Sequence, residues 1–522
     1  MSETVSRIDA ATLKAWLHDG DELALLDARE EVPFDARHLL MTSCVPLSRL
    51  EVLVDALVPR RSARVVWCDD GDRLAEKAAA RMAALGYTDV SLLDGGVAAW
   101  EAAGYPIYSG IHVPSKAFAE VVEHEAGTPW ISAEELQAMI DRGDDIAIYD
   151  SRSYEEYHEN SIPGAVSVPG AELVYRFADL TPSPETTVIV NCGGRTRSII
   201  GAQALINAGV PNKIVSLKNG TQAWHLSGFD VVRGATRRPP EVSPDGLAKA
   251  LDATARIADR FTIRSIRDAT LDVWRAEADR RSLYILDVRT PEEYEAGHLP
   301  DARLAPGGQL VQETDVYLGA WDGRVVLVDD NGVRATITAS WLRQMGWIDL
   351  AIHTIDPTRN DLTSGSYEPR ILGLDAASAP TIDVDALQDT TDTIVDLATS
   401  RQYREGHIPG AQFAIRSRLT SDVSAEALIL TSPDGRLARL AASEIGGGAR
   451  ALAGGTQAWI DKGLALERGA TDMASAPDDI RLKAREQSGA VEDAMRAYLA
   501  WEIDLVNQMA ADDDHRFQVA TS

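Results

Sequence analysis

Cysteine is scarce in this chain, which has three cysteines among 522 residues. Cys44, Cys68 and Cys192 form no Cys-x-x-Cys pair, so the sequence predicts neither a disulfide framework nor a zinc site. We expect a protein that needs no metal and no organic cofactor. Each cysteine has to be judged as a nucleophile or as a small buried residue.

Basic residues are also few relative to acidic ones. The chain has 51 Lys and Arg against 80 Asp and Glu, a net charge of -29. Such an acidic chain repels a phosphate backbone, which excludes nucleic acid as a partner. No apolar run is long enough to span a bilayer, and the first residues lack the basic start and apolar core of a signal peptide. We therefore expect a cytoplasmic protein that does not enter a membrane.

One segment, residues 188–198, delivers a cysteine from an apolar strand into a turn rich in glycine and arginine. Backbone N–H groups converge where the next helix begins, and guanidinium groups nearby favour a thiolate. We expect Cys192 to be a nucleophile that ionises more readily than a free cysteine. The candidate substrate-binding residues are the rest of the loop: Gly193, Gly194, Arg195, Thr196, Arg197 and Ser198.

The order of elements around this loop occurs four times along the chain, once in each of four copies. Each copy has an apolar strand ending in aspartate, followed by a histidine, a turn and a second apolar strand. An arginine closes the next loop five positions after its first residue. On this alignment the four loops begin with Cys68, Cys192, Asp329 and Thr431. We therefore predict that the third and fourth copies are inactive, with Asp329 and Thr431 at the cysteine position.

This order of elements resembles the rhodanese family of sulfurtransferases, in its multidomain bacterial form. The second copy carries the resemblance best, because Asp-x-Arg, Ile-Pro-Gly-Ala, Cys-x4-Arg and Asn-Gly-Thr-x-x-Trp follow one another there. Alternating strands and helices predict the α/β class, with a parallel sheet covered on both faces. The resemblance implies four tandem rhodanese-like domains, each with about five strands. Their expected limits are 8–108, 129–232, 262–355 and 381–466, with a helical tail over 467–522.

The tail has apolar residues at helical spacing, among them Val491, Met495 and Leu499. We expect this helix to pack against the domains, and a homodimer contact is the alternative. Helices are also expected at the connector around residues 114–122 and at the linker near 244–260.

The resemblance implies a double displacement. Cys192 would take a sulfane sulfur from a small anionic donor, thiosulfate or a persulfide, and pass it to a thiol or to cyanide. Arg195 and Arg197 are expected to bind the donor, because planar guanidinium groups suit oxyanions. The physiological donor stays open, because the loop matches neither the thiosulfate-using nor the mercaptopyruvate-using pattern. A neighbouring copy or the connector with Lys116 could complete its pocket.

Supporting roles are expected for a few other residues. We interpret Asp150 and Arg152 as an ion pair beside the loop, and His158 as a turn hydrogen bond. Cys68 with Arg73 is a weaker second-site candidate, because the carboxylates of its loop raise the thiol pKa. Cys44 lies outside any such loop and is expected to be inert.

Two other functions compete with sulfur transfer. A Cys-dependent phosphatase would need a Cys-x5-Arg loop, whereas the arginine here comes one residue sooner. Alternatively, the repeats form a scaffold on which Cys192 carries a persulfide between partner proteins without turnover. Turnover with a small donor and acceptor separates these readings.

Overall fold

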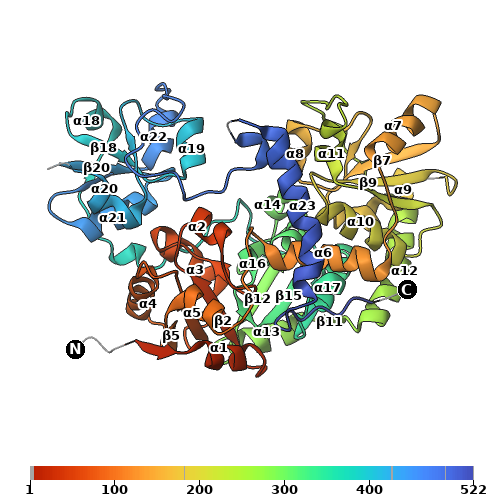
Figure 1. Cartoon of the computed structure of the whole chain (residues 1–522), viewed down its shortest axis with the longest axis horizontal. Coiled ribbons are helices and arrows are strands. Elements are labelled where there is room, and N and C mark those ends of the chain that lie inside the picture. Colours follow the sequence, from red (N-terminus) through yellow and green to blue (C-terminus); the bar gives the residue numbers. More distant parts are fainter. Residues whose placement is uncertain (1–4, 182, 425–426, 488, 521–522) are drawn as a thin grey trace. The chain divides into compact units, whose positions relative to one another are not determined.

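The computed structural model describes residues 5–181, 183–424, 427–487 and 489–520. The chain forms two compact units (Figure 1). The first contains the first and fourth repeats. The second contains the second and third repeats, the connector and the tail from Leu482 onward, and Trp16–Leu23 groups with it.

All four repeats build their sheet in one strand order. In the second repeat the order is β6-β10-β9-β7-β8, and each neighbouring pair is parallel. The corresponding orders are β1-β5-β4-β2-β3, β11-β16-β15-β12-β13 and β17-β21-β20-β18-β19. Because parallel strands are joined by crossovers, helices cover both faces, and central strands become continuous apolar runs. Val188, Ile189 and Val190 are accordingly fully buried. The α/β prediction with four parallel sheets is confirmed.

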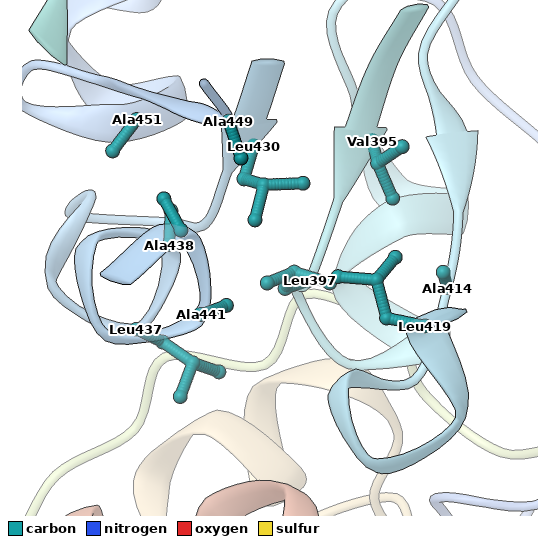
Figure 2. Packing of buried hydrophobic residues seen from close by; sticks show 11 residues of the cluster. Val395, Leu397, Ala414, Leu419, Leu430, Leu437, Ala438, Ala441, Ala449 and Ala451 are labelled. Atoms are coloured by element: carbon teal, nitrogen blue, oxygen red, sulfur yellow. The ribbon is translucent and has the colours of Figure 1, made fainter. Parts of the chain in front are cut away.

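The first unit holds its two repeats together partly through a buried ion pair between Arg416 and Glu51. Figure 2 shows the core of the fourth repeat, where Val395 and Leu430 share a cluster with Ala438 and Ala441 of the following helix. The first repeat has β1 (Ser6–Ile8), α1 (Ala10–Leu17), β2 (Leu23–Asp27), α2 (Glu31–Ala36), β3 (Ser43–Cys44), α3 (Leu50–Leu57), β4 (Arg64–Cys68), α4 (Leu74–Ala84), β5 (Val90–Leu93) and α5 (Gly96–Ala102). The fourth has β17 (Thr381–Ile382), α18 (Val384–Gln388), β18 (Thr393–Asp396), α19 (Ser400–Glu405), β19 (Gln412–Phe413), α20 (Leu419–Asp422), β20 (Leu428–Thr431), α21 (Arg436–Ile445), β21 (Arg450–Leu452) and α22 (Gly455–Asp461).

In the second unit the two repeats pack through the helices that follow their strands. The second repeat has β6 (Trp130–Ile131), α7 (Ala133–Arg142), β7 (Ile146–Asp150), α8 (Tyr154–Glu159), β8 (Val166–Ser167), α9 (Glu172–Leu180), β9 (Thr187–Asn191), α10 (Thr196–Asn207), β10 (Ile214–Leu217) and α11 (Gly220–Leu226). The third has β11 (Arg264–Ile266), α13 (Asp268–Ala276), β12 (Leu283–Asp287), α14 (Pro291–Ala296), β13 (Arg303–Leu304), α15 (Gly307–Gln312), α16 (Thr314–Tyr317), β14 (Ala320–Trp321), β15 (Arg324–Asp329), α17 (Val333–Gln344) and β16 (Leu350–Thr354).

Three helices outside the repeats were expected and are confirmed. They are the connector α6 (Val113–Ala126), the linker α12 (Pro244–Phe261) and the tail helix α23 (Val491–Met509). Helix α12 begins after Ser243, whose hydroxyl accepts the N–H of Gly246, and Pro244 suits its first turn. None of the helices in the described ranges has the length and apolar character needed to cross a bilayer.

The tail helix α23 crosses α6 within the second unit (Figure 1). It buries Met495, Leu499, Leu505 and Met509 in its own chain, as the first of the two expectations for the tail requires. Ile503 is exposed on α23, so the dimer contact left open by the sequence would have to use that side of the helix.

Candidate active site

Cys192 stands between the end of β9 and the start of α10. It is 2% exposed, and its sulfur lies 3.5 Å from the Ser198 hydroxyl. The Ser198 hydroxyl donates to the carbonyl of Arg195 at 2.8 Å, and the backbone N–H of Ser198 is directed at the sulfur. The sulfur is therefore held at the N-terminus of α10, where backbone N–H groups stabilise negative charge.

The turn before α11 fixes the backbone of this cysteine. Both the N–H and the hydroxyl of Thr221 donate to the carbonyl of Cys192 at 2.9 Å. Gly220 has φ of +54°, and a Cβ on it would lie 2.2 Å from that carbonyl oxygen. Trp224 then anchors α11 by donating to the carbonyl of Asp230. The Asn-Gly-Thr-x-x-Trp motif thus positions the nucleophile, although the sequence analysis assigned it no role.

The expectation of a readily ionised thiol is wrong for this arrangement. Burial raises the pKa of Cys192 above its ordinary value. Arg197 and Ser198 lower that pKa, whereas Glu502 of α23 raises it further. Desolvation outweighs the cradle because the sulfur is almost fully buried. Glu502 and Tyr498 of α23 also lie against Gly194 of the loop, which the loop sequence does not indicate.

Both arginines of the loop are already paired. Arg195 donates to Glu120 at 2.5 and 2.7 Å and to Glu123 at 2.7 Å. Burial raises the pKa of Glu120 to about 7 despite this partner. Arg195 therefore fastens the loop to α6. Its proposed contact with a donor stays a prediction.

Arg197 is partly buried and lies closer to the chemistry. It donates to Glu156 at 2.5 Å and to Gln309 of the third repeat at 2.8 Å. Its charge lowers the pKa of Cys192. Burial raises the pKa of Glu156, but Arg197 and Lys483 outweigh it and hold that pKa well below its ordinary value. A neighbouring repeat thus contributes a side chain to the surroundings of the loop.

Asp150 and Arg152 form a buried pair below the loop. Arg152 donates to Asp150 at 2.9 and 2.7 Å, and Asn191 also donates to Asp150. A Cβ on Gly193 would lie 3.7 Å from Cδ of Arg152, so the pair supports the loop directly. His158 is exposed, and its Nδ1 lies 3.1 Å from the carbonyl of Ala235.

The strand registers correct the alignment of the repeats. The carbonyl of Asn191 accepts from Ser151, and those of Cys68, Val328 and Thr431 accept from the corresponding residues of their own repeats. The residues equivalent to Cys192 are therefore Asp69, Asp329 and Ser432. The alignment that placed Cys68 and Thr431 at the cysteine position is wrong by one residue, because a run of apolar residues does not mark where a strand ends.

Cys68 consequently faces the interior of its repeat. Its sulfur lies 3.7 Å from a carboxylate oxygen of Asp27, and burial raises its pKa well above the ordinary value. Arg73 lies on the surface, where it pairs with Glu76. Reactivity at Cys68 stays a prediction. The corrected alignment places Asp69, and not Cys68, at the start of the helix where backbone N–H groups converge. Cys44 ends the edge strand β3, half-buried and 3.6 Å from the carbonyl of Arg29.

In the three other repeats a side-chain oxygen occupies the place of the sulfur. Asp69 accepts the N–H of Ala75 at 3.0 Å, and Ser432 accepts that of Ala438 at 3.2 Å. Asp329 accepts the N–H groups of Arg334 and Ala335 at 2.8 and 3.2 Å. Among the four described loops, sulfur stands at the start of this helix in the second repeat alone.

Glu502 also borders the loop, and it was not among the predicted site residues. This side chain of α23 is 1% exposed and accepts a hydrogen bond from the Thr196 hydroxyl at 2.8 Å. Nothing in the sequence signals the contact, because 306 positions separate the two residues and carboxylates on helices are common.

These features define a protein of tandem parallel α/β repeats with one sulfur-bearing loop. The chain belongs to the rhodanese family. The rhodanese-like domain matches residues 9–103, 132–227 and 270–354. The fourth repeat shares the strand order of these three.

The chain is similar to solved and curated relatives. The crystal structure of a thiosulfate sulfurtransferase from Pseudomonas aeruginosa is 44% identical and covers 99% of this chain and 100% of that one, with a TM-score of 0.95. The putative thiosulfate sulfurtransferase SseB of Mycobacterium tuberculosis is 25% identical over 249 residues, which are 40% of this chain and 80% of SseB.

Other curated relatives share a smaller part. The HTH-type transcriptional regulator Rv0324 of Mycobacterium tuberculosis is 30% identical over 105 residues, which cover 20% of this chain and 45% of the regulator. The probable adenylyltransferase/sulfurtransferase MoeZ of that organism is 37% identical over 98 residues, 18% of this chain and 24% of MoeZ. The chain thus spans less than half of either protein.

Proposed function

We propose that the protein is a sulfurtransferase in which Cys192 carries the sulfur as a persulfide. One observation carries the proposal: of four equivalent loops, the second alone places a sulfur where the others place an oxygen that closes the helix start. The likeness over 99% of the chain to a thiosulfate sulfurtransferase supports the same activity here.

The first half-reaction loads the cysteine. The Cys192 thiolate attacks the outer sulfur of a donor such as thiosulfate, the S–S bond of the donor breaks, and sulfite leaves with the bonding electrons. The N–H groups at the start of α10 and the guanidinium of Arg197 stabilise the thiolate and the new terminal sulfur. We also propose that Arg197 assists the departing anion.

The second half-reaction removes the sulfur from Cys192. An acceptor thiolate, or cyanide, attacks the terminal sulfur of the persulfide, and Cys192 leaves as the thiolate that began the cycle. The buried sulfur disfavours the thiolate at rest, so we expect loading to be fastest at high pH. We place this chemistry in the cytoplasm, where thiols stay reduced.

Mass spectrometry tests the proposal. Incubation of the whole protein with thiosulfate should add one sulfur atom, and peptide mapping should place it on Cys192. The Cys68→Ser protein, which keeps Cys192, is the matched control and should load equally. A protein that loads but shows no turnover with thiosulfate and cyanide would be the persulfide carrier instead. Release of phosphate from a phosphate ester without loading would favour a phosphatase.

A further inference from the structure

One carboxylate at the Cys192 loop has no part in the chemistry described above. The Oε1 atom of Glu502 accepts a hydrogen bond from the Thr196 hydroxyl. The other oxygen, Oε2, is buried and accepts no hydrogen bond from any group in the described part of the chain. Leaving a buried carboxylate oxygen without a donor is costly, so such a group calls for an explanation.

The free oxygen is directed at the backbone of the active-site loop. A Cβ on Gly194 would lie 3.2 Å from Oε2 of Glu502, 3.4 Å from Nε2 of Gln222 and 3.4 Å from a ring carbon of Tyr498. These three side chains therefore surround Gly194, two residues after Cys192. The amide oxygen of Gln222 is also buried without a donor. Gly194 is thus closely bordered by a carboxylate oxygen, an amide nitrogen and an aromatic ring, and the two unsatisfied oxygens belong to Glu502 and Gln222.

No cation of the site compensates Oε2 by a hydrogen bond. Arg195 is engaged by Glu120 and Glu123, and Arg197 by Glu156. The ammonium of Lys116 lies over the rings of Tyr498 and Trp501, 5.4 and 5.1 Å from their centroids. The unsatisfied groups at the loop are acceptors, so a ligand that fits them brings a donor, and a cation fits a carboxylate best.

We propose that Glu502 binds a primary ammonium group on the small thiol that accepts sulfur from Cys192. The acceptor is then an aminothiol. The inference rests on the proposed sulfur transfer. The aminothiol thiolate attacks the terminal sulfur of the Cys192 persulfide, the bond between the two sulfurs breaks, and Cys192 leaves as a thiolate. The ammonium keeps its proton throughout, and the product is the aminothiol persulfide.

Three acceptors test this assignment: cysteamine, 2-mercaptoethanol and 3-mercaptopropionate. Each carries its thiol on a two-carbon chain, and the other end is an ammonium, a hydroxyl or a carboxylate. The whole protein is loaded with one sulfur by thiosulfate, and the rate at which each thiol removes it is followed by mass spectrometry. The Glu502→Gln variant should lower the preference for cysteamine over 2-mercaptoethanol by about tenfold or more, because a charge-assisted contact is lost.

Controls separate this role from a structural one. The intrinsic reactivity of each thiol cancels when the two proteins are compared. The Glu492→Gln variant alters an exposed carboxylate on the same helix, 60% exposed, and should keep the wild-type preference. The Thr196→Val variant removes the hydroxyl that holds Oε1 and should weaken the preference in part, with an unchanged unfolding temperature showing that the fold persists.

Two outcomes would overturn the assignment. If Glu502→Gln slowed all three thiols equally, the carboxylate would act on the thiol proton instead. If Glu502→Gln accelerated the reaction of 3-mercaptopropionate and left that of cysteamine unchanged, the Glu502 carboxylate would serve only to repel anions. Failure of Cys192 to load from thiosulfate or from glutathione persulfide would contradict the proposed function itself, whereas loading with an unaltered preference would contradict the ammonium site alone.

Discussion

The second and third repeats place equivalent arginines in equivalent surroundings. Arg197 pairs with Glu156 and Gln309, and Arg334 pairs with Glu293 and Glu172. The difference lies at the end of the strand before them, where Cys192 stands in one repeat and Asp329 in the other.

The residue at the strand end decides what the loop can do. The Asp329 carboxylate closes the start of α17 by accepting two backbone N–H groups and a contact from Arg334. Cys192 leaves the equivalent donors facing a sulfur. The strand, loop and helix of the fold therefore provide the anion cradle in every repeat. The residue at the strand end determines what occupies this cradle, which is either a side chain of the protein itself or a persulfide.

Removing the sulfur should have the largest effect. We expect Cys192→Ser to lower thiosulfate–cyanide turnover about a thousandfold or more, because the nucleophile is lost. Cys68→Ser should leave most of the rate, since Cys68 lies one residue before the cradle position. Steady-state rates of both variants check this, and equal losses would mean that the first repeat holds a coupled site.

Converting the third loop into the second is the reverse experiment. Asp329→Cys in a Cys192→Ser background should stay below about a hundredth of the parent rate, because Arg334 remains bound to Glu172, Glu293 and Asp330. Turnover is the measurement, and an unfolding curve shows whether the double variant is folded. Recovery to near the parent rate would identify the third repeat as a recently silenced enzyme.

Variants of Arg197 and Arg334 distinguish an effect on stability from an effect on the Cys192 thiol. Arg197→Ala should destabilise the protein by about 1 to 2 kcal/mol, because Glu156 is left with Lys483 as its nearby cation, and should raise the pKa of Cys192. Arg334→Ala should destabilise it by about 3 kcal/mol or more without moving that pKa, because Arg334 is fully buried among four carboxylates. Denaturant unfolding and the alkylation rate of Cys192 against pH report the two effects. An unmoved alkylation profile in Arg197→Ala would confine this arginine to a structural role.

The last expected effect is on how stability varies with pH. Burial raises the pKa of Asp329 to about 7 from an ordinary 3.8. The folded protein therefore holds this proton where the unfolded chain has released it, so stability falls as the pH rises from about 4 to 7. The free energy of unfolding of Asp329→Asn should fall less steeply over this range. Parallel curves for the two proteins would show that Arg334 already keeps Asp329 ionised.

The sequence predicted more of the fold than of the site. Strand runs such as Val188–Val190 and the repeated turns suffice for four parallel sheets, and Cys192 could be singled out because one loop combines sulfur, glycine and arginine. The alignment slipped at Cys68 and Thr431 because hydrogen bonds, not composition, fix where a strand ends. The raised pKa of Cys192 could not be predicted, because it depends on burial and on Glu502, which folding alone brings to the loop.

The position of Glu502 so late in the chain also sets an order of assembly during synthesis. At about 5 to 20 residues per second, the 306 positions between Thr196 and Glu502 take roughly 15 to 60 s to translate. The second repeat can complete its own sheet during that interval, before Glu502 has been made. The loop acquires its carboxylate neighbour when α23 docks, and the mature site is therefore finished by one of the last helices to be made.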